Sequence, residues 1–265
     1  MKLFECINIV YSYTTIPVLN NISLTINNGD FIGIIGPNGA GKSTLIKCLA
    51  RILTPVSGNI YYNGNNITAI PKKQYAQQVA TVMEIEHLLP YTVESFVALG
   101  RFPHSSFGRY DDEDISIIDN AIAYCAINTI KNKKLTQLSS GELQRVNIAR
   151  ALAQSTQCIL LDEPISHLDI RHTVAIMDIL KNLHKRGSTI ITIIHDINIA
   201  SEYCSRIIGL KQGTIIFDDT PEKCITYHTI EALFDCVCLV YNNPISNKPF
   251  VYPVPGHIQY NKHRQ

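Results

Sequence analysis

Nine consecutive residues have the types and the order that bind phosphate: Gly36, Pro37, Asn38, Gly39, Ala40, Gly41, Lys42, Ser43 and Thr44. They satisfy the pattern G-x-x-x-x-G-K-[ST], in which glycines let successive backbone N–H groups turn toward phosphate oxygens. The start of a following helix adds partial positive charge. We expect Lys42 to reach the β- and γ-phosphates of a nucleotide and Ser43, with Thr44 beside it, to bind Mg²⁺. The alternative, an ordinary glycine-rich turn, is disfavoured because an apolar strand precedes the loop and a helix follows it.

A pair of adjacent carboxylates forms the second candidate group. The apolar run at 158–161 ends at Asp162, and Glu163 follows it. An unpaired carboxylate after a buried strand is poorly solvated, so two in succession need a reason. Asp162 fits the metal side of a nucleotide site, and Glu163 fits a general base for a water that attacks the γ-phosphate. The alternative for Glu163 is a helix-capping or surface acid.

The elements that position these groups alternate between strands and helices. Apolar runs predict strands at 31–35, 158–161 and 189–194, and helices are expected from 42, after 169 and from 197. Alternating units of this kind favour a parallel sheet with helices on both faces. The first thirty residues alternate as in β-strands, with a turn at Asn28-Gly29, and 58–64 predicts a strand that returns to this first sheet. The fold class is therefore α/β.

The pattern becomes helical between about 86 and 150. Thr92 is expected to cap one helix, and Gly100 to stop it. The segment 111–127 places acids in a first turn and apolar residues at 115, 118, 122 and 125, which predicts one buried face. We expect one domain over 1–235 that contains this helical insert, followed by a C-terminal extension over 236–265.

Composition restricts the classes of function. Apolar residues make up 46% of the 265, and 23 Lys and Arg balance 22 Asp and Glu, so no basic surface for nucleic acid is expected. The N-terminus lacks the apolar stretch of a signal peptide, and no run is long enough to span a bilayer. We expect a cytosolic protein, or one held at a membrane by a partner. The eight scattered cysteines fit a reducing compartment, and Cys236, Cys238 and His228 match no common metal pattern.

Further motifs resemble those of the ABC-transporter ATPases. The stretch LSSGELQRVNIARAL, from 138, is similar to the signature of that family, and SHLD at 166–169 is similar to its D-loop. His195 matches its switch histidine, and Tyr13 stands where an aromatic ring stacks on adenine. The resemblance covers essentially the whole chain. It implies a P-loop NTPase core with a RecA-like parallel sheet, an N-terminal antiparallel β subdomain and an α-helical insert.

The resemblance also implies ATP and Mg²⁺ as cofactors and a homodimer that pairs head to tail. The signature of one chain would then close on the γ-phosphate held by the other, His195 would contact that phosphate, and Asp169 would link the two sites. The signature residues concerned are Ser139, Ser140, Gly141 and Glu142. From the residues alone, this segment is a capped helix start that could attract an anion, and His195 is a packed histidine.

Glu84 departs from the family pattern. The family usually has Gln at the end of the strand that leads into the insert, where it touches Mg²⁺ and water. Glutamate can still bind a hard cation, but it adds negative charge near the phosphates. Our hypothesis is that ATP binding is kept and that coupling is weaker or differently gated. The alternative is that Glu84 only faces solvent.

The insert and the tail resemble those of one class of transporter. LPYTVESFVALGRFPH, at 89–104, and the layout of 218–253 are similar to ATPases of type II importers for iron–siderophore complexes, haem or vitamin B12. The resemblance implies integral membrane permease subunits, an extracytoplasmic solute-binding protein and a place at the cytoplasmic face of the membrane. Phe96, Phe102 and Phe107 would form a socket for a permease helix, or would pack the insert itself. An importer for zinc or molybdate, and an exporter, stay open. A soluble ABC ATPase is disfavoured because the chain has one P-loop and no heptad run.

Overall fold

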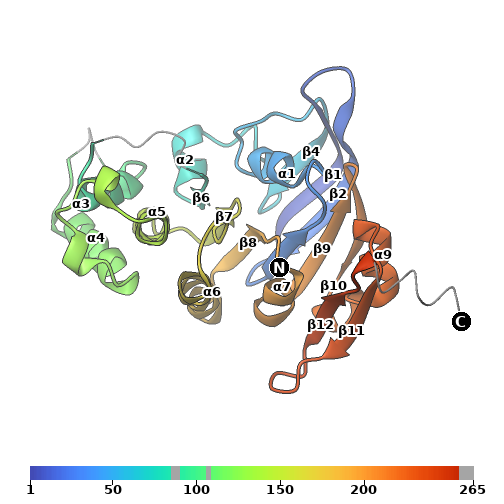
Figure 1. Ribbon diagram of the computed structural model, residues 1–265. Helices are drawn as coiled ribbons and strands as arrows, with labels where there is room; N and C mark the ends of the chain where they lie inside the picture. The colour runs from blue at the N-terminus through green and yellow to red at the C-terminus, as the bar shows by residue number, and fades with distance from the viewer. Residues whose placement is uncertain (85–89, 106–108, 257–265) are drawn as a thin grey trace, which may run out of the picture.

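The computed structural model describes residues 1–84, 90–105 and 109–256. Its centre is a six-stranded sheet in the order β10-β9-β3-β8-β7-β6 (Figure 1). Five of these strands are parallel, and β10 pairs antiparallel at one edge. Their bounds are β3 (Phe31–Ile35), β6 (Val79–Val82), β7 (Cys158–Leu161), β8 (Thr189–Ile193), β9 (Arg206–Lys211) and β10 (Thr214–Asp219). The predicted α/β class and its parallel sheet are confirmed.

A second, antiparallel sheet is built mainly from the N-terminal residues. Its order is β2-β1-β4-β5, and its strands are β1 (Lys2–Ser12), β2 (Pro17–Asn27), β4 (Ser57–Tyr62) and β5 (Asn65–Asn66). The strand predicted at 58–64 is β4, which pairs with β1. Register shifts in β1 adjoin Asn8, whose φ is +52°, and they leave Ile7 exposed on a strand whose other apolar residues are largely buried.

The central sheet is covered on both faces. Side chains of β3 alternate between two apolar clusters: Phe31 and Ile35 pack with α6 (Ile170–Lys185), and Ile32 and Ile34 pack with α1 (Lys42–Leu49). Helix α7 (Ile197–Tyr203) packs on the α6 side (Figure 1). A continuous apolar run is what a strand buried on both faces requires.

The helical insert holds α3 (Val93–Ala98), α4 (Asp112–Tyr124) and α5 (Ser140–Ala153), with 3₁₀ turns at Leu99–Arg101, Asn128–Ile130 and Leu135–Gln137. A short helix, α2 (Lys72–Ala76), precedes β6. Thr92 caps α3 as predicted, because its hydroxyl accepts from the Ser95 N–H at 3.2 Å. The insert extends away from the central sheet at the β6 edge (Figure 1).

Two expectations about the insert were wrong. Gly100 does not stop α3: the helix ends at Ala98, and the chain continues into a 3₁₀ turn that contains Gly100. A β-carbon there would lie 2.1 Å from the Arg150 carbonyl oxygen, so glycine permits close helix packing. Ile115 is 51% exposed. The buried face of α4 instead includes Asp114, which pairs with the Arg101 guanidinium at 2.7 Å.

The C-terminal residues add α8 (Pro221–Cys224), α9 (Tyr227–Phe234) and a hairpin of β11 (Cys238–Asn242) and β12 (Pro249–Pro253). The hairpin contacts α7: Asn198 donates to the Val251 carbonyl at 3.1 Å, and Ser201 donates to the Pro249 carbonyl at 2.6 Å. Of the helices in the described ranges, none is both long and apolar enough to cross a bilayer.

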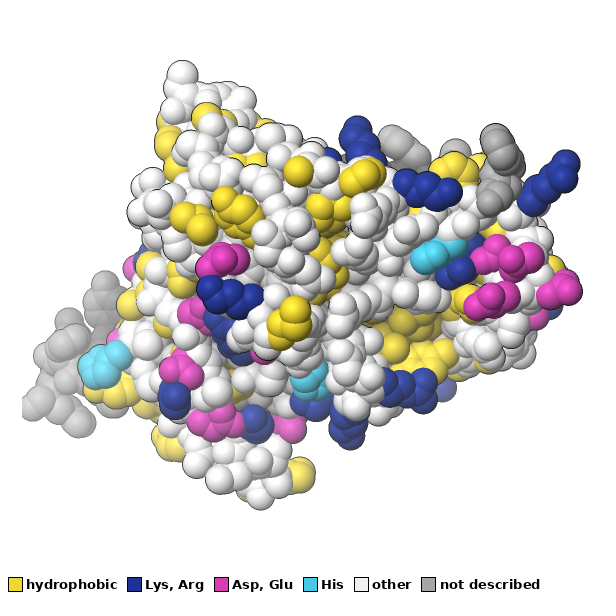
Figure 2. All heavy atoms as spheres, turned by 180° about the vertical axis from the view of Figure 1, so that it is seen from behind, with side chains coloured by type: hydrophobic (Ala, Val, Ile, Leu, Met, Phe, Trp, Pro, Cys, Tyr) yellow, Lys and Arg dark blue, Asp and Glu magenta, His cyan; other side chains and the backbone are white. Residues whose placement is uncertain are grey.

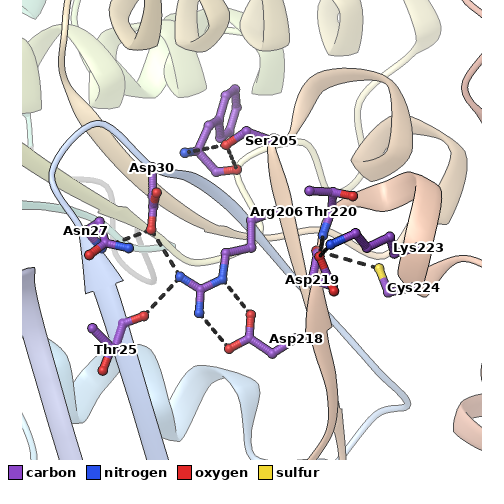
Figure 3. A network of polar contacts seen from close by, with 11 residues as sticks. Thr25, Asn27, Asp30, Ser205, Arg206, Asp218, Asp219, Thr220, Lys223 and Cys224 are labelled. Atoms are coloured by element: carbon purple, nitrogen blue, oxygen red, sulfur yellow. Dashed lines mark hydrogen bonds and ion pairs between the residues drawn. The ribbon is translucent and has the colours of Figure 1, made fainter.

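Arg206 joins the two sheets (Figure 3). Its guanidinium donates to both carboxylate oxygens of Asp218, at 2.5 and 2.6 Å. The same group donates to the Thr25 carbonyl at 2.9 Å and to Asp30 at 3.1 Å. Strands β2, β9 and β10 are thereby held around one cation.

Candidate nucleotide-binding site

A pocket of about 1030 Å³ lies beside the ends of β3 and β8. Among the residues predicted from the sequence, those that line it are Tyr13, Asn38, Gly39, Ala40, Gly41, Lys42, Ser43, Thr44, Glu163 and His195. The lining also includes residues to which no role was given, among them Ile165, Thr173, Val174 and Ile199. Residues far apart in the chain are therefore collected at one opening.

The glycine loop connects β3 to α1. Gly36 has φ +152°, and a β-carbon there would lie 2.0 Å from the Leu210 carbonyl oxygen, so only glycine fits beside β9. Helix α1 begins at Lys42, whose ammonium group donates to the carbonyls of Gly36 and Pro37 at 2.8 and 2.9 Å. Burial lowers the pKa of Lys42, while the charges of Glu163 and Asp162 act in the opposite sense. A cation and a helix N-terminus thus meet in this loop.

Asp162 and Ser43 form an oxygen pair at the base of the loop. The Ser43 hydroxyl donates to Asp162 Oδ1 at 2.9 Å, and the Asp162 N–H donates to the Val82 carbonyl at 2.9 Å. Burial raises the pKa of Asp162, and the hydrogen bond from Ser43 opposes that shift. Two adjacent hard oxygens, one of them on a partly desolvated carboxylate, are suited to a divalent cation.

Glu163 is held by two side chains. His195 Nε2 lies 2.7 Å from Glu163 Oε1, and the Ser166 hydroxyl donates to Oε2 at 2.9 Å. Burial acts to raise the pKa of Glu163, but the hydrogen bonds from Ser166 and His195 outweigh it, and the pKa is lowered. A carboxylate held ionised in a pocket can accept a proton from water. The bond from Ser166 to Glu163 was not predicted; the sequence signals for Ser166 are its position three residues after Glu163 and its place at the start of SHLD.

Tyr13 stands at the rim of the same pocket. Its ring is 58% exposed and packs edge-to-face on Tyr11 with centroids 5.0 Å apart. An exposed aromatic face at a pocket rim can stack on a planar base.

The signature residues begin α5. Ser139 caps the helix: its hydroxyl accepts from the Glu142 N–H at 3.3 Å, and its own N–H donates to Glu142 Oε2 at 2.9 Å. The backbone bond from Ser139 is the main cause of a lowered pKa at Glu142. None of Ser139, Ser140, Gly141 and Glu142 is among the residues that line the pocket.

Asp169 caps α6 next to the signature. One oxygen of Asp169 accepts from the His172 N–H at 2.8 Å and lies 2.8 Å from His172 Nδ1. The backbone bond from His172 is the main cause of a lowered pKa at Asp169. A β-carbon on Gly141 would lie 2.5 Å from the His172 ring, so the starts of α5 and α6 are in contact. Asp169 also lies outside the pocket lining.

Glu84 and the aromatic residues of the insert lie away from the pocket lining, as far as the structure describes them. Glu84 is exposed, lies two residues beyond the end of β6 and does not line the pocket. Phe96 is half-buried, with the Arg150 guanidinium 5.4 Å from its ring centre, whereas Phe102 is 66% exposed. Phe107 lies outside the described residues. Seen from behind, the insert end carries apolar side chains among groups of both charges (Figure 2).

Comparison with known proteins assigns this arrangement to a family. Residues 19–166 match the model of the ABC transporter family. The petrobactin import ATP-binding protein YclP of Bacillus subtilis is 40% identical over 87% of this chain and 92% of its own length. The ferric enterobactin transport ATP-binding protein FepC of Escherichia coli is 34% identical over 91% and 90%.

The fold has a close counterpart among solved structures. A metal-chelate type ABC transporter in an inward-facing conformation superposes with a TM-score of 0.84 over 97% of this chain and 99% of that one, at 24% identity. This likeness shows the fold. The family match and the two relatives show that the chain belongs to the ABC transporter family, as one of its ATP-binding, ATP-hydrolysing subunits.

Proposed function

We propose that this ATPase powers an importer for an iron(III)–siderophore or a related metal chelate such as haem or cobalamin. The observation that carries the proposal is the pocket in which Lys42, Glu163 and His195 meet, in a chain whose relatives include ATP-binding proteins for petrobactin import and ferric enterobactin transport. The insert and the C-terminal region support the same class by their resemblance. The ATPase unit is residues 1–235, and 236–265 form an extension.

The residues of the pocket have separate tasks in hydrolysis. The ammonium group of Lys42 exchanges the carbonyls of Gly36 and Pro37 for phosphate oxygens. The backbone N–H groups of the loop bind the same phosphates, and Tyr13 stacks on adenine. Glu163 accepts the proton of the attacking water because the bonds from Ser166 and His195 keep it ionised. His195 is in turn placed to contact the γ-phosphate.

Mg²⁺ fits the oxygen pair at the base of the loop. Ser43 and Asp162 would hold it, since their oxygens already lie 2.9 Å apart. When bound, the ion neutralises part of the charge on the phosphates.

The signature requires a second chain. In one chain, Ser139–Glu142 stand outside the pocket lining, at the start of α5, where Ser139 and Ser140 are exposed. A head-to-tail homodimer brings the signature of each chain to the phosphates of the other, and Asp169 lies beside it to link the two sites. ATP then favours the closed dimer and hydrolysis the open one, and this difference shifts the membrane subunits between conformations.

The partners follow from this assembly. Two integral permease subunits sit in the membrane, the homodimer binds them at the cytoplasmic face, and an extracytoplasmic protein delivers the solute. The exposed Phe102, with Leu99 and Tyr91 near it in sequence and also exposed, supplies apolar contacts for a permease segment.

The test uses Glu163→Gln, which removes the base and keeps the shape. Hydrolysis should fall about 10²–10⁴-fold with ATP affinity unchanged, as measured by phosphate release and by equilibrium nucleotide binding. Glu5→Gln, at an exposed pair with Lys2, is the matched control.

In a pull-down, Glu163→Gln protein that carries an affinity tag is incubated with ATP and native membranes. It should retain a polytopic membrane protein in stoichiometric yield, because the ATP-bound state is trapped. Recovery of ribosomes or soluble factors alone would contradict the importer proposal and leave the ATPase assignment standing.

A further inference from the structure

Side chains of α5 occupy the outer edge of the central sheet. Strand β6 is the last in the order β10-β9-β3-β8-β7-β6, so no strand of the described residues pairs with its outer carbonyl groups. Three side chains donate to this edge: Asn147 of α5 to the Met83 carbonyl just beyond β6 (2.8 Å), Arg150 of α5 to the Thr81 carbonyl (2.8 Å), and Gln154, the residue that caps the end of α5, to the Val79 carbonyl (3.1 Å). We call these three bonds the α5–β6 contact.

The spacing of the α5–β6 contact matches the two elements. Steps of three and four residues along a helix advance about 4.5 and 6 Å, and a step of two residues along a strand advances about 6.6 Å. Carbonyls two residues apart in a strand point to the same side, so each donor meets the next available acceptor. The contact therefore satisfies backbone groups that a buried edge would otherwise leave unpaired.

The last bond of the contact lies at a functional position. Asn147 is 1% exposed, and its Oδ1 accepts from Arg150 at 3.1 Å, which directs its amide N–H to Met83. On the other side of the same segment, the Val82 carbonyl accepts from the N–H of Asp162. The chain that enters Glu84 is thus held between α5 and the backbone of Asp162, the residue whose carboxylate is assigned to the metal.

We propose that Asn147 is a positioning residue: it fixes the peptide that leads into Glu84, next to the strand end bonded to the Asp162 N–H, and links it to the start of α5. The Met83 carbonyl belongs to the peptide plane that leads into Glu84, so the bond from Asn147 sets the direction in which Glu84 leaves the sheet. Helix α5 starts at Ser140, two turns earlier. Anion binding at that end and Mg²⁺ binding at Asp162 are then coupled. This inference rests on the proposed function.

Equilibrium binding of a fluorescent ATP analogue, titrated with Mg²⁺, tests the proposal without hydrolysis. Asn147→Leu keeps the approximate shape and removes the donor. In this variant, the Mg²⁺ concentration at which the affinity for the analogue has risen by half of its full increase should be several-fold higher. The affinity for the analogue without Mg²⁺ should be unchanged. Gln154→Met removes the opposite end of the same contact, far from Glu84 in the strand, and should change neither value. Thermal unfolding of both variants reports their structural cost, and Asn147→Ser replaces Asn147→Leu if the latter does not fold.

A double-mutant cycle with Glu84→Ala identifies the route of the effect. If Asn147 acts through Glu84, Asn147→Leu should have no further effect on the Mg²⁺ response in the Glu84→Ala background. Equal responses of Asn147→Leu and Gln154→Met, or an additive effect in the double variant, would overturn the inference. If the wild-type protein showed no Mg²⁺-dependent binding of the nucleotide, that result would instead contradict the proposed function.

Discussion

At the scale of single residues, the proposed base Glu163 is held in place by its backbone and by two side chains. Its backbone has φ +51°, in the left-handed region, where a residue other than glycine costs about 1–3 kcal/mol unless its surroundings hold it. Both carboxylate oxygens have a partner: His195, just after the end of β8, and Ser166, three residues after Glu163. The strain directs the carboxylate into the pocket, and the two partners keep it ionised there.

Ser166→Ala should move the acid limb of hydrolysis to higher pH. The hydrogen bond from the Ser166 hydroxyl is one of the interactions that lower the pKa of Glu163, against the effect of burial. Without it the pKa rises toward its ordinary value, so the base becomes protonated at a higher pH and kcat falls earlier on acidification. A pH profile of kcat measures the shift. Ser188→Ala, outside the pocket lining, should leave the profile unchanged; an identical shift there would contradict the assignment.

At the scale of elements, Arg206 is the point where β2, β9 and β10 are tied together (Figure 3). Hydrogen bonding to Asp218 raises the pKa of Arg206 despite its partial burial, so the group stays charged. The bonds to both Asp218 oxygens use the planar shape of the guanidinium.

Arg206→Met should lower the free energy of unfolding by about 2 kcal/mol, since it leaves Asp30 and Asp218 partly buried without a cation. Arg206→Lys should recover only part of this, because an ammonium group cannot bond both Asp218 oxygens in parallel. Lys2→Met, which breaks an exposed pair, should cost little. Urea unfolding measures all three, and equal costs for Arg206→Met and Lys2→Met would contradict the role of the network.

These elements also mark what the sequence could predict. The loop at 36–44 and the caps at Thr92 and Ser139 are contiguous, so short-range patterns were enough. Arg206 bonds to the Thr25 carbonyl 181 residues away, and Asn147 bonds to the Met83 carbonyl 64 residues away, so no local spacing reveals these two bonds. Ile115 follows the helical period yet is exposed, because Arg101 draws Asp114 inward instead. Short-range sequence patterns therefore predicted the phosphate loop and the helix caps, whereas the contacts of Arg206, Asn147 and Asp114 depend on tertiary structure.

At the scale of the whole molecule, two parts of the nucleotide machinery stand apart in one chain. Lys42 lines the pocket, whereas Ser140 is exposed at the start of α5 and does not. If each site combines the loop of one chain with the signature of the other, two defective chains can complement each other. Lys42→Ala damages a loop, and Ser140→Asp puts a carboxylate where the second chain's phosphate would bind.

In a mixed dimer of these two variants, one site carries both defects and the other carries none. Random pairing of equal amounts should restore intact sites to about a quarter of the total, since half the dimers are mixed and each has one intact site. Light scattering measures ATP-dependent dimer formation, with both variants made in the Glu163→Gln background. Dimers should be absent for each variant alone and should appear when the two are mixed. If mixing restored nothing while Ser140→Asp alone still bound ATP, the signature would act within its own chain, and the head-to-tail assembly would be wrong.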